Sequence, residues 1–298
     1  MLKRLFNTFF FGNFFYGLCV VMLSIETRIQ FNWPLQPISW YILIYCTTVV
    51  FYRFAYLKTS NHPQDNDNAR AVWFQQNKQA IQFTQWILIT CSIGAGSIYL
   101  WYHLQKLDLN TILFATSFPL TAALYYSVFF PKLIPIHIRH TGWLKPFIIG
   151  YVWAGIVTTF PIILDQPNPN SILEPLHRFL FIKNWLFVSV LAILFDIKDF
   201  AADNNLELKT FVVRFGLPKT IFLIVIPITI IGWAMIALTA TRLHIPLLRV
   251  LINAIPFVLL IIAALSLLQR KPILYYLAVI DGLLLVKAIC GIIAFTII

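Results

Sequence analysis

Long apolar stretches recur along the whole chain, and they constrain its fold more than any other feature. A helix needs about 20 mostly apolar residues to cross the hydrocarbon core of a bilayer. Nine such stretches lie near residues 6–25, 38–57, 80–101, 109–128, 143–164, 179–195, 219–240, 245–268 and 273–296. Only 11% of the residues are charged, against about a quarter in soluble domains. The sequence therefore predicts an all-α, polytopic membrane bundle of about nine spans, forming one domain over residues 1–298.

Basic residues are unevenly divided between the segments that join these stretches. If the N-terminus is inside, the inner segments hold fifteen of the 22 lysines and arginines, the outer segments hold six, and Lys287 lies within the last stretch. The positive-inside rule therefore predicts an inner N-terminus and an outer C-terminus. Lys3 and Arg4 precede the first stretch, but no small-residue cleavage site follows it, so we expect a retained span rather than a signal peptide. The expected location is the plasma (inner) membrane if the protein is bacterial.

The net charge of +11 has an explanation in this topology and in attraction to an anionic inner leaflet. No nucleic-acid-binding module is visible in the sequence, so no nucleic acid is expected as a partner. The four cysteines stand singly in apolar stretches, without the spacing of a zinc site or a disulfide framework. The bilayer is the expected surrounding, and no protein partner is inferred.

Four of the eleven acids gather directly after the sixth stretch, namely Asp196, Asp199, Asp203 and Glu207. At about 100° per residue, the three aspartates fall on one helix face within about 60°. Like charges on one face repel, so the row is either solvated at a helix end or neutralised by a hard cation such as Mg²⁺. Because the row joins an apolar stretch to an inner loop, metal binding is the favoured interpretation.

The motif D-I-x-D-x-x-x-D, which begins at Asp196, is followed by Lys209-Thr210 and by a short segment ending at Gly216 before the next apolar stretch. This pattern resembles the second aspartate motif of the UbiA superfamily of intramembrane prenyltransferases. The segments 125–132 and 142–155 are similar to the tyrosine-to-lysine segment of that family and the helix it introduces. The resemblance covers roughly residues 110–220, and the number of spans extends it to the rest of the chain.

The resemblance implies an enzyme that moves an isoprenoid chain from a prenyl diphosphate to an aromatic or lipid acceptor in the membrane. In that family, two aspartate-rich motifs hold Mg²⁺ against the diphosphate, and the metal draws charge from the leaving group. By position, the catalytic and metal-binding carboxylates would be Asp196, Asp199 and Asp203. The corresponding substrate contacts would be Lys198, Lys132 and Tyr126.

The first aspartate motif of the family, N-D-x-x-D-x-x-x-D, is missing from the inner end of the second stretch, where Arg53 and Lys58 stand among aromatic residues. The next acids, Asp65 and Asp67, lie in a polar stretch with a proline and are expected in a loop. One hypothesis is an enzyme in which Arg53, Lys58 or Arg70 neutralises the diphosphate, since guanidinium groups bind phosphate bidentately. The alternative is a catalytically degenerate member that binds or carries lipids, with these cations as inner-face anchors.

An unrelated nine-span transporter is the remaining alternative, and it would need a coupling site near the bilayer midplane. The gathering of the acids at the inner rim argues against it. Asp281 and Lys287 lie six residues apart in the ninth stretch, too far for an i, i+4 pair. We therefore expect both of them to contact other helices.

Overall fold

The computed structural model describes residues 2–59, 69–103, 109–125, 142–163, 175–200 and 208–296. Throughout these ranges the regular elements are helices and no strand occurs, which confirms the all-α prediction. The chain divides into two compact units. The first unit comprises residues 1–22 and 35–106, and the second comprises residues 23–34 and 107–298. The single domain over the whole chain stays a prediction.

Within the described ranges, six helical segments are long and apolar enough to cross a membrane: Lys78–His103, Lys145–Ile163, Pro175–Lys198, Leu217–Arg242, Leu247–Ser266 and Ile273–Thr296. A seventh span is possible if Arg4–Phe11 and Phe14–Gln30, which meet at a bend of 62°, cross as a pair. Ile38–Phe54 and Ile112–Tyr125 are shorter apolar helices. Within the described residues, each predicted stretch coincides with helical structure, and the chain is an integral, multi-pass membrane protein. The count of nine is not confirmed, because two of the helices are short.

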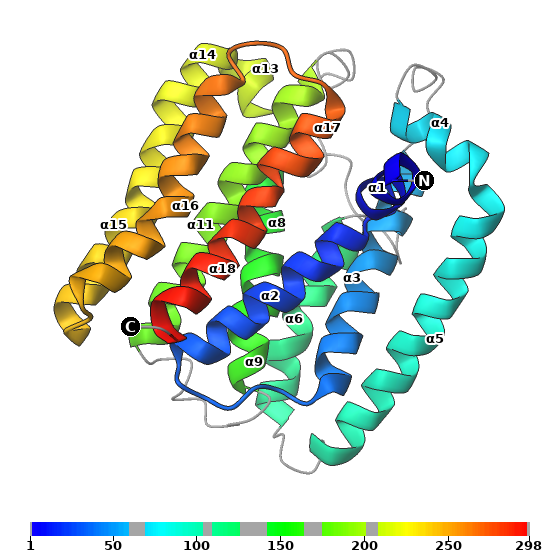
Figure 1. Ribbon diagram of the computed structural model, residues 1–298, viewed down its shortest axis with the longest axis horizontal. Coiled ribbons are helices and arrows are strands. Elements are labelled where there is room, and N and C mark those ends of the chain that lie inside the picture. Colours follow the sequence, from blue (N-terminus) through cyan, green and yellow to red (C-terminus); the bar gives the residue numbers. More distant parts are fainter. Residues whose placement is uncertain are drawn as a thin grey trace. The chain divides into compact units, whose positions relative to one another are not determined.

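The first unit contains α1 (Leu2–Phe11), the beginning of α2 (Phe14–Gln30), α3 (Ile38–Thr59), α4 (Ala69–Gln76) and α5 (Lys78–His103). Helices α3 and α5 run side by side (Figure 1). Cys46 and Val49 on α3 pack against Leu88 on α5, and the hydroxyl oxygens of Thr47 and Ser92 lie 2.8 Å apart. This contact combines apolar packing with a polar link between the two helices.

Two arginines hold the break between α1 and α2. Asn13 takes a left-handed φ of 64°, which ends the helical hydrogen bonding at this point. The buried Arg53 donates from Nε to the carbonyl oxygen of Gly12 at 2.9 Å and from Nη1 to Thr84 Oγ1 at 2.9 Å. Arg70 donates to the side-chain oxygen of Asn13. The carbonyl left open by the bend therefore has a charged donor.

The second unit is a bundle around α11 (Pro175–Lys198), which packs against α8 (Lys145–Ala154) and α15 (Ile226–Leu243). Helix α15 runs beside α16 (Leu247–Ser266), and α16 beside α18 (Gly282–Thr296) (Figure 1). The other elements are α6 (Leu109–Tyr125), α9 (Phe160–Ile163), α13 (Phe211–Phe215), α14 (Leu217–Thr220), α17 (Ile273–Tyr275) and the π-helical turns η3 (Gly155–Thr159), η4 (Ile221–Val225) and η5 (Tyr276–Ile280).

Glycine permits the close approach of α8 to α11. A Cβ atom at Gly150 would collide with the backbone carbonyl of Trp185 and with the Ser189 hydroxyl. The Trp185 indole donates to the carbonyl oxygen of Phe147 at 2.8 Å. This packing fixes the first residue of α8, Lys145, near the last turn of α11.

Candidate functional site

An ion pair joins the ends of α8 and α11 in the second unit. Lys145 Nζ lies 2.7 Å from Asp196 Oδ1, and the side chains are 32% and 2% exposed, respectively. The other carboxylate oxygen, Asp196 Oδ2, is buried and has no hydrogen-bond partner among the described residues. Buried polar atoms are nearly always hydrogen-bonded in native proteins. Asp196 is therefore a carboxylate with an oxygen open to a further ligand.

A second pair follows on the same helix end. Lys198 Nζ lies 2.6 Å from Asp199 Oδ1, and the Asp199 side chain is 41% exposed. Asp196 and Asp199 stand three residues apart, so both belong to the same helix face. The sequence-predicted grouping of Asp196, Lys198 and Asp199 at this end of α11 is thus present, and Lys145 joins it from α8.

The remaining predicted site residues belong to the first unit or lie outside the described residues. Arg53 lies in the first unit, where it holds the α1–α2 break, so its contact with a diphosphate stays a prediction. Lys58 belongs to α3, but its side chain is outside the described structure. The predicted residues Asp203, Tyr126 and Lys132, together with Glu207, Asp65 and Asp67, also lie outside the described residues.

The donors at the end of α11 fit a hard cation. Mg²⁺ prefers oxygen ligands in octahedral geometry and commonly combines one or two carboxylates with water and phosphate oxygens. Asp196 Oδ2 is an unused buried oxygen, and Asp199 is partly exposed beside it. No cluster of three His, Cys, Asp or Glu side chains suited to a metal occurs within the described ranges. Two carboxylates would leave most of the coordination shell to a ligand.

A second polar cluster is buried between α2, α11 and α18 within the second unit. Glu26 Oε1 lies 3.2 Å from Lys183 Nζ, and Glu26 Oε2 lies 2.7 Å from Lys287 Nζ. Gln30 donates to Glu26 Oε1 at 2.9 Å. All of these side chains are buried. The expectation that Lys287 contacts another helix is confirmed.

Neither Glu26 nor Lys183 stands out from the sequence, because each lies in or next to an apolar stretch with no motif around it. The sequence nonetheless contains an indication that these residues pair. An ionisable residue that faces the interior of a membrane bundle needs a partner. Lone charges of opposite sign in different stretches are therefore candidates for pairing, although their spacing in the sequence cannot say which ones pair.

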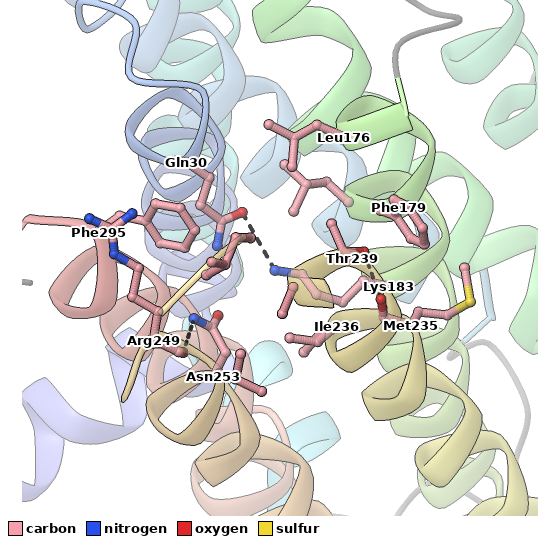
Figure 2. A pocket seen from close by; sticks show the side chains of 14 residues that line it. Gln30, Leu176, Phe179, Lys183, Met235, Ile236, Thr239, Arg249, Asn253 and Phe295 are labelled. Carbon is pink, nitrogen blue, oxygen red and sulfur yellow. Dashed lines mark hydrogen bonds between the residues drawn. The ribbon is translucent and has the colours of Figure 1, made fainter. Parts of the chain in front are cut away.

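A small pocket, with a cavity volume of about 40 Å³, adjoins this buried cluster. Figure 2 shows Lys183 reaching toward Gln30, and Arg249 lying along the ring of Phe295. Most of the other lining residues are apolar and come from α11, α15 and α16. Lys183 precedes Asp196 by 13 residues on the continuous α11, which corresponds to about 20 Å at 1.5 Å per residue. The pocket is therefore separate from the carboxylates at the end of α11.

Comparison with known proteins supports the fold. No family model and no curated protein matches the chain. It is similar to a solved structure from a study of digeranylgeranylglyceryl phosphate synthase in membranes, with a TM-score of 0.59 and 13% sequence identity. The match covers 99% of this chain and 100% of the other. At this identity the likeness is one of fold.

Proposed function

We propose that the protein is a UbiA-like prenyltransferase, which moves an isoprenoid chain from a prenyl diphosphate to an aromatic or lipid acceptor in the membrane. The observation that carries the proposal is the buried, unpartnered Oδ2 of Asp196 beside Lys145. This open oxygen lies in a chain whose fold is similar to that of a synthase named for a lipid with two geranylgeranyl chains. A diphosphate needs cations as its leaving-group charge develops.

In this proposal Asp196 and Asp199 hold Mg²⁺, and Asp203 adds a carboxylate by its spacing in the motif. When bound, the ion neutralises the diphosphate oxygens. Lys145 and Lys198 form ion pairs with Asp196 and Asp199, and each ammonium group has three hydrogen-bond donors that can also serve a diphosphate. Lys145 is partly exposed and is our addition to the predicted contacts Lys198, Lys132, Tyr126, Arg53 and Lys58.

One observation favours the second candidate, a catalytically degenerate protein that binds or carries lipids. Arg53, which stands where the family has its first aspartate motif, is buried, and two of its nitrogens already donate to Gly12 and Thr84. If that guanidinium does not reach a diphosphate, the first of the three cations expected in that half of the site is lost, and only Lys58 and Arg70 remain for this role. Such a protein would bind an isoprenoid without transferring it.

The test uses the purified full chain in lipid nanodiscs with Mg²⁺ and labelled geranyl, farnesyl and geranylgeranyl diphosphates. Quinone precursors, tetrapyrroles and phosphoglycerol lipids serve as acceptors. Calorimetry should give weak Mg²⁺ binding alone and strong binding when a prenyl diphosphate is present, because two or three acids do not complete the octahedral shell.

Asp196→Asn should abolish both this coupling and transfer, whereas Lys219→Gln, which removes an exposed cation near the start of the following span, should preserve both. Coupling that survives Asp196→Asn would refute the metal assignment. Ligand binding without turnover on any acceptor would select the degenerate candidate.

A further inference from the structure

The buried cluster of Glu26, Lys183 and Lys287 carries an excess of positive charge. One carboxylate faces two ammonium groups, at 3.2 Å and 2.7 Å, and the side chains are 1%, 5% and 3% exposed in the order given. Gln30 contributes no charge. A net charge inside a membrane protein is costly unless a partner compensates it. The partner of the excess charge should therefore be an anion that reaches the cluster.

The pocket beside the cluster supplies a route for such an anion. Lys183 and Arg249 both line it, and none of its lining residues is acidic. Arg249 Nε is buried and has no hydrogen-bond partner among the described residues. Its guanidinium lies 4.9 Å from the ring centroid of Phe295, which positions it without satisfying that donor. Two cations thus face one cavity, and one of them has an unused N–H.

The rest of the lining identifies the kind of anion. The pocket walls are mainly apolar, with Leu176, Leu180, Ile236 and Val250 among them. A small hydrated anion would lose water on such walls without gaining hydrogen bonds in return, which costs free energy. A hydrocarbon chain is instead stabilised by burial against them. Arg249 is the third residue of α16, directly after the turn that ends α15. Arginine side chains near the ends of membrane-spanning helices reach lipid head groups.

We propose that this pocket binds one anionic phospholipid of the bilayer. The phosphate accepts a hydrogen bond from Arg249 Nε and is attracted by the excess charge at Lys183, while an acyl chain lies along the apolar wall. The site is separate from the carboxylates of Asp196 and Asp199. Its occupation requires neither Mg²⁺ nor a prenyl diphosphate, so it does not depend on the proposed transferase activity.

Native mass spectrometry of the detergent-solubilised full chain tests this proposal. The protein is titrated with phosphatidylglycerol and, separately, with phosphatidylcholine of the same acyl chains, in the absence of Mg²⁺. We expect one phosphatidylglycerol to bind at least tenfold more tightly than phosphatidylcholine. Arg249→Gln should lower phosphatidylglycerol affinity about tenfold or more, the usual effect of losing one charge-assisted hydrogen bond, and should reduce the preference for phosphatidylglycerol over phosphatidylcholine.

The matched control is Arg242→Gln, which removes an exposed cation from the last turn of α15 that does not line the pocket. It should leave both affinities unchanged. Equal losses in the two variants would overturn the site, as would equal affinity of the wild type for the two lipids. Farnesyl diphosphate that displaces phosphatidylglycerol from the wild type, and binds Arg249→Gln weakly, would overturn the phospholipid assignment. Thermal unfolding of each variant checks that the fold is intact.

Discussion

Lys287 Nζ lies 2.7 Å from Glu26 Oε2, although 261 residues separate the two in the sequence. The other oxygen of the same carboxylate takes Lys183 at 3.2 Å. Glu26 therefore joins three helices through one side chain, and it is the acid on which both buried lysines depend. Removing the acid would raise the net charge of the buried cluster, whereas removing one lysine would lower it to zero. The two kinds of substitution should therefore differ in their effect on stability.

Glu26→Gln should destabilise the protein strongly, because it leaves two buried ammonium groups without a counter-charge. Breaking a buried ion pair in this way typically costs about 3 to 5 kcal/mol. Lys287→Met should cost clearly less, since it leaves a neutral pair of Glu26 and Lys183 and replaces a charge by an apolar side chain. Thermal unfolding in detergent, followed by circular dichroism, measures both. Equal destabilisation would contradict this charge balance.

Gly291→Ala should also destabilise the second unit, because a Cβ atom at this position would collide with the carboxylate of Glu26. The acid would have to move away from Lys287, one turn earlier on α18. Gly282→Ala is the matched control on the same helix, since a Cβ there meets nothing within 4 Å. We expect a clear fall in unfolding temperature for the first substitution and little or none for the second. A pair of equal shifts would show that helix propensity, not the contact with Glu26, decides the effect.

Lys145→Met should lower stability by about 1 to 3 kcal/mol, because it leaves the buried carboxylate of Asp196 with no partner. The cost is below that of a fully buried pair because Lys145 is 32% exposed. Adding Asp196→Asn to Lys145→Met should restore most of the loss, since the unpaired charge is then removed. A double-mutant cycle of unfolding free energies gives the coupling between the two residues. Additive losses would mean that the pair contributes nothing to stability.

Arg53→Met should destabilise the first unit, because the carbonyl of Gly12 and the hydroxyl of Thr84 both lose a donor. The control is Lys78→Met, which removes an exposed cation from the first residue of α5 and should have a smaller effect. Prenyl diphosphate affinity is measured on the same variants by calorimetry. Unchanged stability together with a loss of affinity of about tenfold or more would assign Arg53 to the substrate rather than to the bend.

The predicted topology rests on the 15 to 6 partition of basic residues and has its own test. Single cysteines at Gln269 and at His244, which are exposed residues at the two ends of α16, are introduced into a cysteine-free chain. An impermeant thiol reagent added outside should label the His244 position and spare the Gln269 position. The reverse pattern would invert the orientation of the whole second unit.

The predictable part of the fold is the part that local sequence determines. Apolar length fixes where helices lie, and the spacing of Asp196 and Asp199 places both on one face of α11. The partner of Asp196 could not be predicted this way, because Lys145 is 51 residues earlier and only the packing of α8 on α11 brings it near. Glu26 depends on two such distant contacts. The bend after α1 could not be predicted for the same reason, because Arg53 stabilises it from another helix.

The long sequence separations around Glu26 mean that its partners are synthesised long after it. Chains grow at roughly 5 to 20 residues per second, so the 157 residues that separate Glu26 from Lys183 take roughly 8 to 30 s to synthesise. Lys287, 261 residues on, follows after roughly 13 to 50 s. During this interval α2 carries an acid whose counter-charges do not yet exist, and such a residue is unfavourable in the bilayer core. Helix α2, made near the start of synthesis, thus reaches its final electrostatic environment only when α18, the last helix, enters the membrane.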